Sequence, residues 1–486
     1  MAISSTGLGS GLNVESIITQ LMTLEKRPLD ILKQKDQVDQ ARLSAFGQVK
    51  SQFDNLKATA ASVATASSWQ AVSATLGNTA VASAIAVAGA TPGTYAIEVT
   101  NLAQAHTLAS AAYAASTTVV GTGTLNIDIG TYSAGVFTPN AGTTTKTAAI
   151  TVSNNTLAGV RDAINAANAG VTASIVTDAS GARLAVTSNA TGATNSVRMT
   201  VTNDGDANDT DTSGLSALAF NPAAAINNGK NLTSAQAALD ANLKISGITI
   251  ASASNTLTGA LDGVTLTLTG TNAGAPTTLT IANNRTALTQ MAQQFVTNYN
   301  NTVKTLSDLT KADPNGKATG ILQADATARS LKSSLQGLLH QPVTGITTPY
   351  TTLSDVGITA QKDGTLTLDS AKFTAALDSG IDKVAALFTT TGSSTDPKTQ
   401  GIALRVSNTI GNALSSIVDS RSLGIQTSLK SRSKSEIALN NRLALVEQRL
   451  RNQYLALDKQ MNQLNGLQQA LTQMLTQLSA NSTNRN

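Results

Sequence analysis

Six leucines near the end of the 486-residue chain recur at strict seven-residue intervals. They are Leu443, Leu450, Leu457, Leu464, Leu471 and Leu478. Because two turns of an α-helix take about seven residues, this repeat predicts one long helix with a narrow apolar stripe. A helix of about 40 residues is roughly 60 Å long, which exceeds the width of a small domain, so it needs a partner along its length.

An apolar pattern near the start of the chain can supply that partner. Asn13 is a favourable helix N-cap, with Glu15 in the first turn. Pro28 occupies one stripe position and predicts a kink or short break, with a new helix starting on the proline. We therefore expect a coiled-coil leg made from both chain ends, marginally stable before assembly because glutamines dilute the C-terminal stripe. The N-terminal stripe consists of Val14, Ile17, Leu21, Leu24, Ile31 and Val38.

The sequence between the two ends is rich in β-strand patterns from about residue 78 to residue 282. Alternating apolar residues mark strands, as at Tyr95, Ile97 and Val99, and turn signals separate them. One helix, at residues 156–167, interrupts this region, and helical patterns resume at Asn284. A later hairpin turns at Asp363-Gly364.

Ends that pair around a β-rich middle predict nested domains. The expected fold class is α+β multidomain, with paired long terminal helices, a helical stem domain and two nested β-rich insertion domains. The expected boundaries are 1–41 with 446–486 for the leg, 42–77 with 283–445 for the stem, 78–113 with 233–282 for the inner β domain, and 114–232 for the outer β domain.

Composition excludes several classes of function. Charged residues make up 13% of the chain, about half the usual share, and the small polar residues that replace them suit sheets solvated by hydroxyls and amides. The chain has no cysteine, and no run of about 18 apolar residues could cross a membrane. No cleaved signal peptide is expected, because the start lacks a basic segment and Glu15 interrupts any apolar core. The basic residues near the C-terminus are interleaved with apolar positions, which indicates a solvated helix face rather than a nucleic-acid site.

The sequence predicts no enzyme, cofactor or metal site. Gly7, Gly9 and Gly11 resemble a phosphate-binding loop, but no strand precedes them, so a flexible leader is expected. His106 and His340 are the two histidines; neither lies in a catalytic signature, and both are expected at the surface or a boundary.

The acidic run at residues 204–211 superficially resembles a calcium loop. An EF-hand needs glycine at its sixth position and glutamate at its twelfth, where this chain has Asp209 and Leu215. The run is therefore expected to be a solvated turn.

Several segments, spread along almost the whole chain, form a recognisable set. The most specific is G-T-Y-A-I-E-V-T-N-L-A-Q-A, at residues 93–105, and only about 206–231 has no match. The others are G-L-G-S-G-L-N-V-E-S-I-I-T-Q-L-M, E-K-R-P-L-D-I-L, T-L-A-G-V-R-D-A-I-N, F-V-T-N-Y-N, L-S-D-V-G-I and D-G-T-L-T-L-D. Taken in the order in which they occur along the chain, these segments resemble those of the flagellar filament cap proteins, also called the flagellar hook-associated protein 2 family.

This resemblance implies an extracellular structural protein at the distal tip of the bacterial flagellum, secreted by the flagellar type III apparatus. Family members form a homo-oligomeric cap that retains exported flagellin and promotes its folding and insertion. The two terminal stripes are then the expected self-assembly and filament contacts. A type III export chaperone bound to the C-terminal segment and host mucin are further candidate partners.

Two alternatives remain open. A hook–filament junction protein or a flagellin shares helical ends and β insertions, although the segment at residues 93–105 and the D-G-T-L-T-L-D hairpin favour the cap family. A surface adhesin is the second alternative, because residues 70–145 are rich in threonine and contain no lysine or arginine. No binding motif supports adhesion directly.

Overall fold

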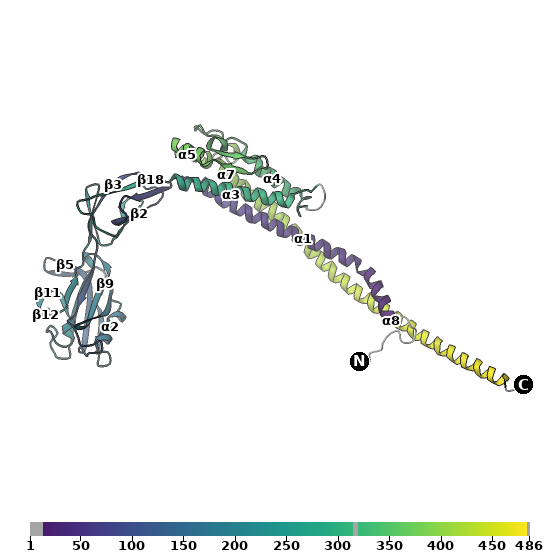
Figure 1. The fold of residues 1–486 in the computed structure, drawn as a ribbon, viewed down its shortest axis with the longest axis horizontal. Coiled ribbons are helices and arrows are strands. Elements are labelled where there is room, and N and C mark those ends of the chain that lie inside the picture. The colour runs from purple at the N-terminus through teal and green to yellow at the C-terminus, as the bar shows by residue number, and fades with distance from the viewer. Residues whose placement is uncertain (1–12, 314–318, 484–486) are drawn as a thin grey trace. The chain divides into compact units, whose positions relative to one another are not determined.

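The computed structural model describes residues 13–313 and 319–483, which excludes the glycine-rich start at residues 7–11. Residues 1–69 with 289–486 form a helical unit, and residues 70–288 form a β unit. Long helices at both ends and a β-rich middle confirm the expected α+β class (Figure 1).

Two long helices, α1 (Val14–Ala64) and α8 (Asp419–Thr483), run antiparallel in the helical unit. Asn13 caps α1 as expected, its side chain accepting a 3.0 Å hydrogen bond from the Ser16 N–H. The prediction at Pro28 is a kink or a short break with a new helix starting on the proline; α1 is one continuous helix through that residue, so the break and the new start are wrong. Met22 and Leu29 pack against α8 on either side of the proline and hold both halves in one helix.

Shorter elements complete the helical unit around an aromatic core. Trp69 stacks on Phe388 with ring centroids 5.2 Å apart, and its Nε1–H donates to the Val63 carbonyl. The hairpin predicted at Asp363-Gly364 is present. The elements are η1 (Ala66–Trp69), α3 (Arg285–Thr310), α4 (Ala326–Leu339), η4 (Leu353–Val356), β19 (Ile358–Ala360), β20 (Leu366–Leu368), α5 (Ser370–Ser379), α6 (Ile381–Thr389), η5 (Pro397–Thr399), α7 (Ile402–Ala413) and the π-helix η6 (Leu414–Val418).

Two sheets of the β unit enclose one core, which we call the inner core. It contains Ile97 and Val99, the buried residues of the alternating segment recognised in the sequence. The five-stranded sheet has the order β1 (Val72–Leu76), β18 (Thr277–Asn283), β3 (Gly93–Asn101), β14 (Ala241–Ile245) and β15 (Ile248–Ser252). The three-stranded sheet has the order β16 (Thr256–Leu261), β17 (Val264–Leu268) and β2 (Ala82–Ala86).

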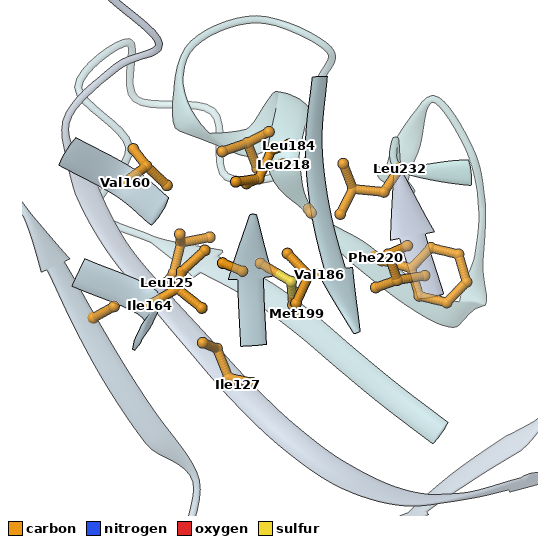
Figure 2. Close-up of a cluster of buried hydrophobic side chains, with 14 of the residues drawn as sticks. Leu125, Ile127, Val160, Ile164, Leu184, Val186, Met199, Leu218, Phe220 and Leu232 are labelled. Carbon is orange, nitrogen blue, oxygen red and sulfur yellow. The ribbon is translucent and has the colours of Figure 1, made fainter. Parts of the chain in front are cut away.

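A separate, outer core lies between two further sheets and α2 (Leu157–Ala166), as Figure 2 shows. The helix predicted at residues 156–167 is present: Thr156 caps α2, and Leu157, Val160 and Ile164 form its fully buried face. One sheet has the order β12 (Asn228–Lys230), β11 (Phe220–Ile226), β10 (Ser196–Thr202), β5 (Gly123–Ser133) and β6 (Val136–Pro139), with β7 (Lys146–Ile150) also on β5. The other has the order β13 (Thr233–Gln236), β4 (Ala105–Ala109), β9 (Gly181–Thr191) and β8 (Val171–Asp178). Two 3-10 turns, η2 (Ala193–Asn195) and η3 (Leu215–Leu218), lie beside them.

Strand pairing divides the β unit differently from the expected domain boundaries. Strand β1 pairs with β18 in the inner sheet, although the sequence placed it with the helical stem. Strands β4 and β13 pair with each other beside β9, although the sequence placed both in the inner domain. Strand patterns alone do not identify a pairing partner, so boundaries inferred from them shift by a strand.

Candidate assembly surface

The two long helices meet through a short apolar contact. Its buried residues are Val14, Ile18, Met22 and Leu29 of α1 and Leu443 of α8. Leu439, Val446, Leu450 and Tyr454 of α8 pack against them and are partly buried. Beyond Tyr454, α8 continues to Thr483 past the first residue of α1. Among the described residues, the apolar contact with α1 therefore extends along only part of α8.

An ionic layer follows the apolar contact along the same pair of helices. The Arg432 guanidinium donates to the carboxylates of Asp36 and Asp39, and Arg42 donates to Asp39 at 3.1 Å. Burial alone would raise the pKa of Asp39, but the hydrogen bonds from Arg432 and Arg42 hold it below its usual value. A half-buried charged layer of this kind favours one register of two helices over others.

The predicted N-terminal stripe is mostly not the one that contacts α8. Val14 is buried in the contact and Ile17 is half-buried, but Leu21, Leu24, Ile31 and Val38 are exposed. The contact uses a neighbouring stripe of α1 that includes Asp36 and Asp39. Because these two positions are charged, the seven-residue apolar repeat of this stripe is interrupted in the sequence. The signal that could have found it is the pair of carboxylates, Asp36 and Asp39, at heptad positions of the stripe that contains Val14, Ile18, Met22 and Leu29.

The predicted C-terminal stripe divides at Tyr454. Leu443 is buried and Leu450 is partly buried against α1. The remaining members are exposed: Leu457 (42%), Leu464 (59%), Leu471 (58%) and Leu478 (68%). Leu467, Met474 and Leu475 widen this surface. Residues 455–483 lie beyond the apolar contact with α1, and in this sense only we call them the free end of α8.

The free end has little to stabilise it as a solitary helix. Asp458 and Lys459 are its charged residues, so intrahelical ion pairs contribute little. Most stability of protein helices comes from packing an apolar face, and here that face is open to solvent. The free end therefore presents an exposed apolar stripe, which is a candidate surface for contact with another helix.

Other residues with catalytic or metal-binding potential have structural roles. Asp204, expected in a solvated turn, is buried instead, and its carboxylate accepts hydrogen bonds from the backbone N–H groups of Leu215 and Ser216. His340 is exposed at the end of α4. Within residues 13–313 and 319–483, no cluster of three or more His, Asp or Glu residues could hold a metal ion. No helix in these ranges is long and apolar enough to cross a membrane.

His106, expected at a surface or boundary, is buried in the outer part of the β unit. Its Nδ1 accepts a 2.8 Å hydrogen bond from the Val197 N–H, so Nε2 carries the proton and faces Ser234 Oγ at 3.1 Å. Burial lowers the pKa of His106 below its ordinary value.

Acid is expected to destabilise this part of the protein through His106. Because its folded pKa is depressed, the unfolded chain binds more protons between that value and about 6.5, so stability is full above pH 6.5 and falls below it. Thermal denaturation between pH 7.5 and 5 should show a falling midpoint. In His106→Gln, which keeps an acceptor but does not titrate, the midpoint should change less over this range; an unchanged pH response would contradict this role.

Comparison with known proteins identifies the group to which this architecture belongs. The model described as Flagellar hook-associated protein 2 N-terminus matches residues 10–106, and the corresponding C-terminus model matches residues 238–466. A Flagellin hook IN motif matches residues 137–190, which include α2 and β8.

Full-length relatives agree with these matches. The B-type flagellar hook-associated protein 2 of Pseudomonas aeruginosa is 30% identical over 494 residues, covering 98% of each chain. Flagellar hook-associated protein 2 of Escherichia coli K12 is 32% identical and covers 97% of this chain and 98% of its own. The crystal structure of the flagellar cap protein FliD from Escherichia coli, in its three-domain form, is 31% identical and covers 79% of this chain and 99% of its own, with a TM-score of 0.62. The chain belongs to the flagellar hook-associated protein 2 family, whose members are structural flagellar cap proteins and not enzymes.

Proposed function

We propose that this chain is the subunit of a homo-oligomeric cap at the distal end of the flagellar filament, outside the cell. There it retains exported flagellin and promotes its folding and insertion. The observation that carries the proposal is the free end of α8, whose leucine stripe is exposed in the single chain. A long helix that buries its stripe only on assembly suits a subunit that is stable alone and becomes ordered at the growing end of a filament.

The remaining parts of the chain fit a scaffold. Two separate cores in the β unit and an aromatic core in the helical unit close without the free end of α8. We extend the proposal to a four-part organisation of leg, stem, inner β domain and outer β domain. Before assembly, the free end is also the proposed contact for a type III export chaperone. Host mucin binding, a hook–filament junction role and primary adhesion gain no support from this surface.

Truncation after Tyr454 tests the proposed function. Residues 455–483 lie outside the α1–α8 apolar contact, so the shortened chain should stay soluble and unfold at the same temperature within a few degrees. In a strain lacking its cap protein, the truncated chain should be secreted but should not restore filaments, and monomeric flagellin should accumulate in the medium. Normal filaments would refute the proposal. Loss of folding would instead show that the free end belongs to the core of the single chain.

A further inference from the structure

A cavity lies beside the outer core of the β unit. Its volume is about 500 Å³, which is within the usual range of small-ligand pockets. Its lining includes residues of β11, β12 and β13, and β12 and β13 are edge strands of the two outer sheets. Three of the lining residues, Phe220, Pro222 and Leu232, are buried and form an apolar floor; Figure 2 shows the first and the last of them. We call this space the β12–β13 cavity.

The cavity contains a lysine that has no acidic partner. Of the described residues that line it, Lys230 alone carries a formal charge, and none is an aspartate or glutamate. The three arginines of residues 105–238, Arg161, Arg183 and Arg198, each form an ion pair with an aspartate, whereas Lys230 forms none with a described residue. Its Nζ lies 5.9 Å from the centre of the Phe220 ring instead. A half-buried ammonium group held over an aromatic ring and left without a counter-ion attracts an anion.

The other polar groups of the cavity are uncharged. His106 is neutral, because its Nδ1 accepts a hydrogen bond from the Val197 N–H, and its Nε2 faces Ser234 Oγ at 3.1 Å. Two larger side chains, Tyr132 and Ile226, are exposed and belong to the rim. Such a lining suits a ring that carries hydroxyl groups. The hydroxyl and amide side chains that line the cavity are those of Tyr132, Ser196, Asn227, Asn231, Thr233 and Ser234.

We propose that the β12–β13 cavity binds an acidic monosaccharide, a sugar ring that carries one carboxylate. The Lys230 ammonium pairs with the carboxylate, the hydroxyl and amide side chains bond with the ring hydroxyls, and the C–H face of the ring packs on Tyr132 and Phe220. A fatty acid needs a longer apolar lining than three buried residues provide. This binding goes beyond the proposed cap function and does not depend on assembly, because all the lining residues belong to the β unit of one chain.

Titration calorimetry of the full-length protein with three small probes tests the proposal. Glucuronate should bind with a dissociation constant below about 1 mM. Glucose, which lacks the carboxylate, and cyclohexanecarboxylate, which lacks the hydroxyl groups, should each bind at least about tenfold more weakly, because each loses hydrogen bonds of the site. Equal binding of glucose would overturn the role of the lysine, and equal binding of cyclohexanecarboxylate would overturn the sugar class. Absence of glucuronate binding would overturn the proposal as a whole.

A pair of lysine variants locates the binding. Lys230→Gln should weaken glucuronate binding about tenfold and leave glucose binding unchanged. Lys146→Gln is the matched control, because Lys146 is an exposed residue of the same sheet that forms no ion pair with a described residue and does not line the cavity. It should bind glucuronate like the parent. Parent-like binding by Lys230→Gln, or an equal loss in Lys146→Gln, would overturn the proposal.

A rim variant and salt keep the test independent of folding. Tyr132→Ala changes an exposed side chain, so it should melt like the parent and still weaken the binding of glucuronate and glucose. Added salt should weaken glucuronate binding to the parent more than to Lys230→Gln, since it screens the ion pair that only the parent forms. Unchanged affinity in Tyr132→Ala, or the same salt response in both proteins, would show that glucuronate binds outside this cavity.

Discussion

Changing Leu457 and Leu464 together to Asp is expected to abolish capping while leaving the isolated protein folded. Both side chains are exposed in the single chain, so the substitutions act on its stability only through helix propensity. The free energy of unfolding of the isolated protein should therefore fall by less than about 1 kcal/mol. In the assembled state each carboxylate would lie in an apolar contact without a partner, at a cost of several kcal/mol. Swimming should fail in a complemented cap-null strain, and monomeric flagellin should appear in the medium.

Two matched variants separate assembly from folding. Leu443→Asp changes the same stripe inside the α1–α8 contact, where the leucine is buried. It should unfold the paired helices of the isolated protein, because it lowers the free energy of unfolding of this contact by more than about 3 kcal/mol. Leu457→Met with Leu464→Met keeps an apolar face of similar volume, so both the thermal stability and the swimming should stay close to those of the parent. Thermal denaturation followed by circular dichroism distinguishes the three. A double Asp variant that swims normally would show that solvent covers this stripe even in the filament.

Periodicity in the sequence predicted the elements well where one face is continuously apolar. The leucine repeat predicted α8, and the helix predicted at residues 156–167 is α2, whose Leu157, Val160 and Ile164 are buried. The same signal failed on α1, because the stripe that contacts α8 includes Asp36 and Asp39, whereas an exposed stripe is more regular. Period alone reports that a face is apolar, and does not report which neighbour covers it.

Long-range partners account for the other differences. The hydrogen-bond partners of Asp204 are 11 and 12 residues away, and those of His106 are 91 and 128 residues away, so neither burial follows from local sequence. A break at Pro28 was expected from backbone chemistry, because proline removes one hydrogen-bond donor. Apolar packing of Met22 and Leu29 on α8 outweighs that loss.

Replacing residues 105–238 with Asn-Gly is expected to remove the whole outer core and leave the rest of the protein folded. Strands β3 and β14 are antiparallel neighbours, with Asn101 opposite Asn242, and the bridge between Gln104 and Leu239 lies three residues farther along each strand. A two-residue Asn-Gly turn closes such a pair as a β-hairpin. The shorter loop also costs less entropy to close than the inserted domain does.

The single tryptophan reports whether the helical unit stays folded, because Trp69 lies against Phe388 in that unit. Its fluorescence transition in urea should keep its midpoint, while the total change in circular dichroism falls with the lost strands. The deletion removes a few hydrogen bonds between the two parts of the β unit, and each of them contributes about 1 kcal/mol to stability. Examples are those from the Ala193 N–H to Asp240 Oδ1 and from Thr191 Oγ1 to the Ala253 carbonyl. Ile97→Asp, which places a charge in the inner core, is the destabilising control for the circular-dichroism transition of the β unit. A midpoint of that transition that falls as far in the deletion as in this control would mean that the outer core supports the inner one, and that the β unit folds as a single domain.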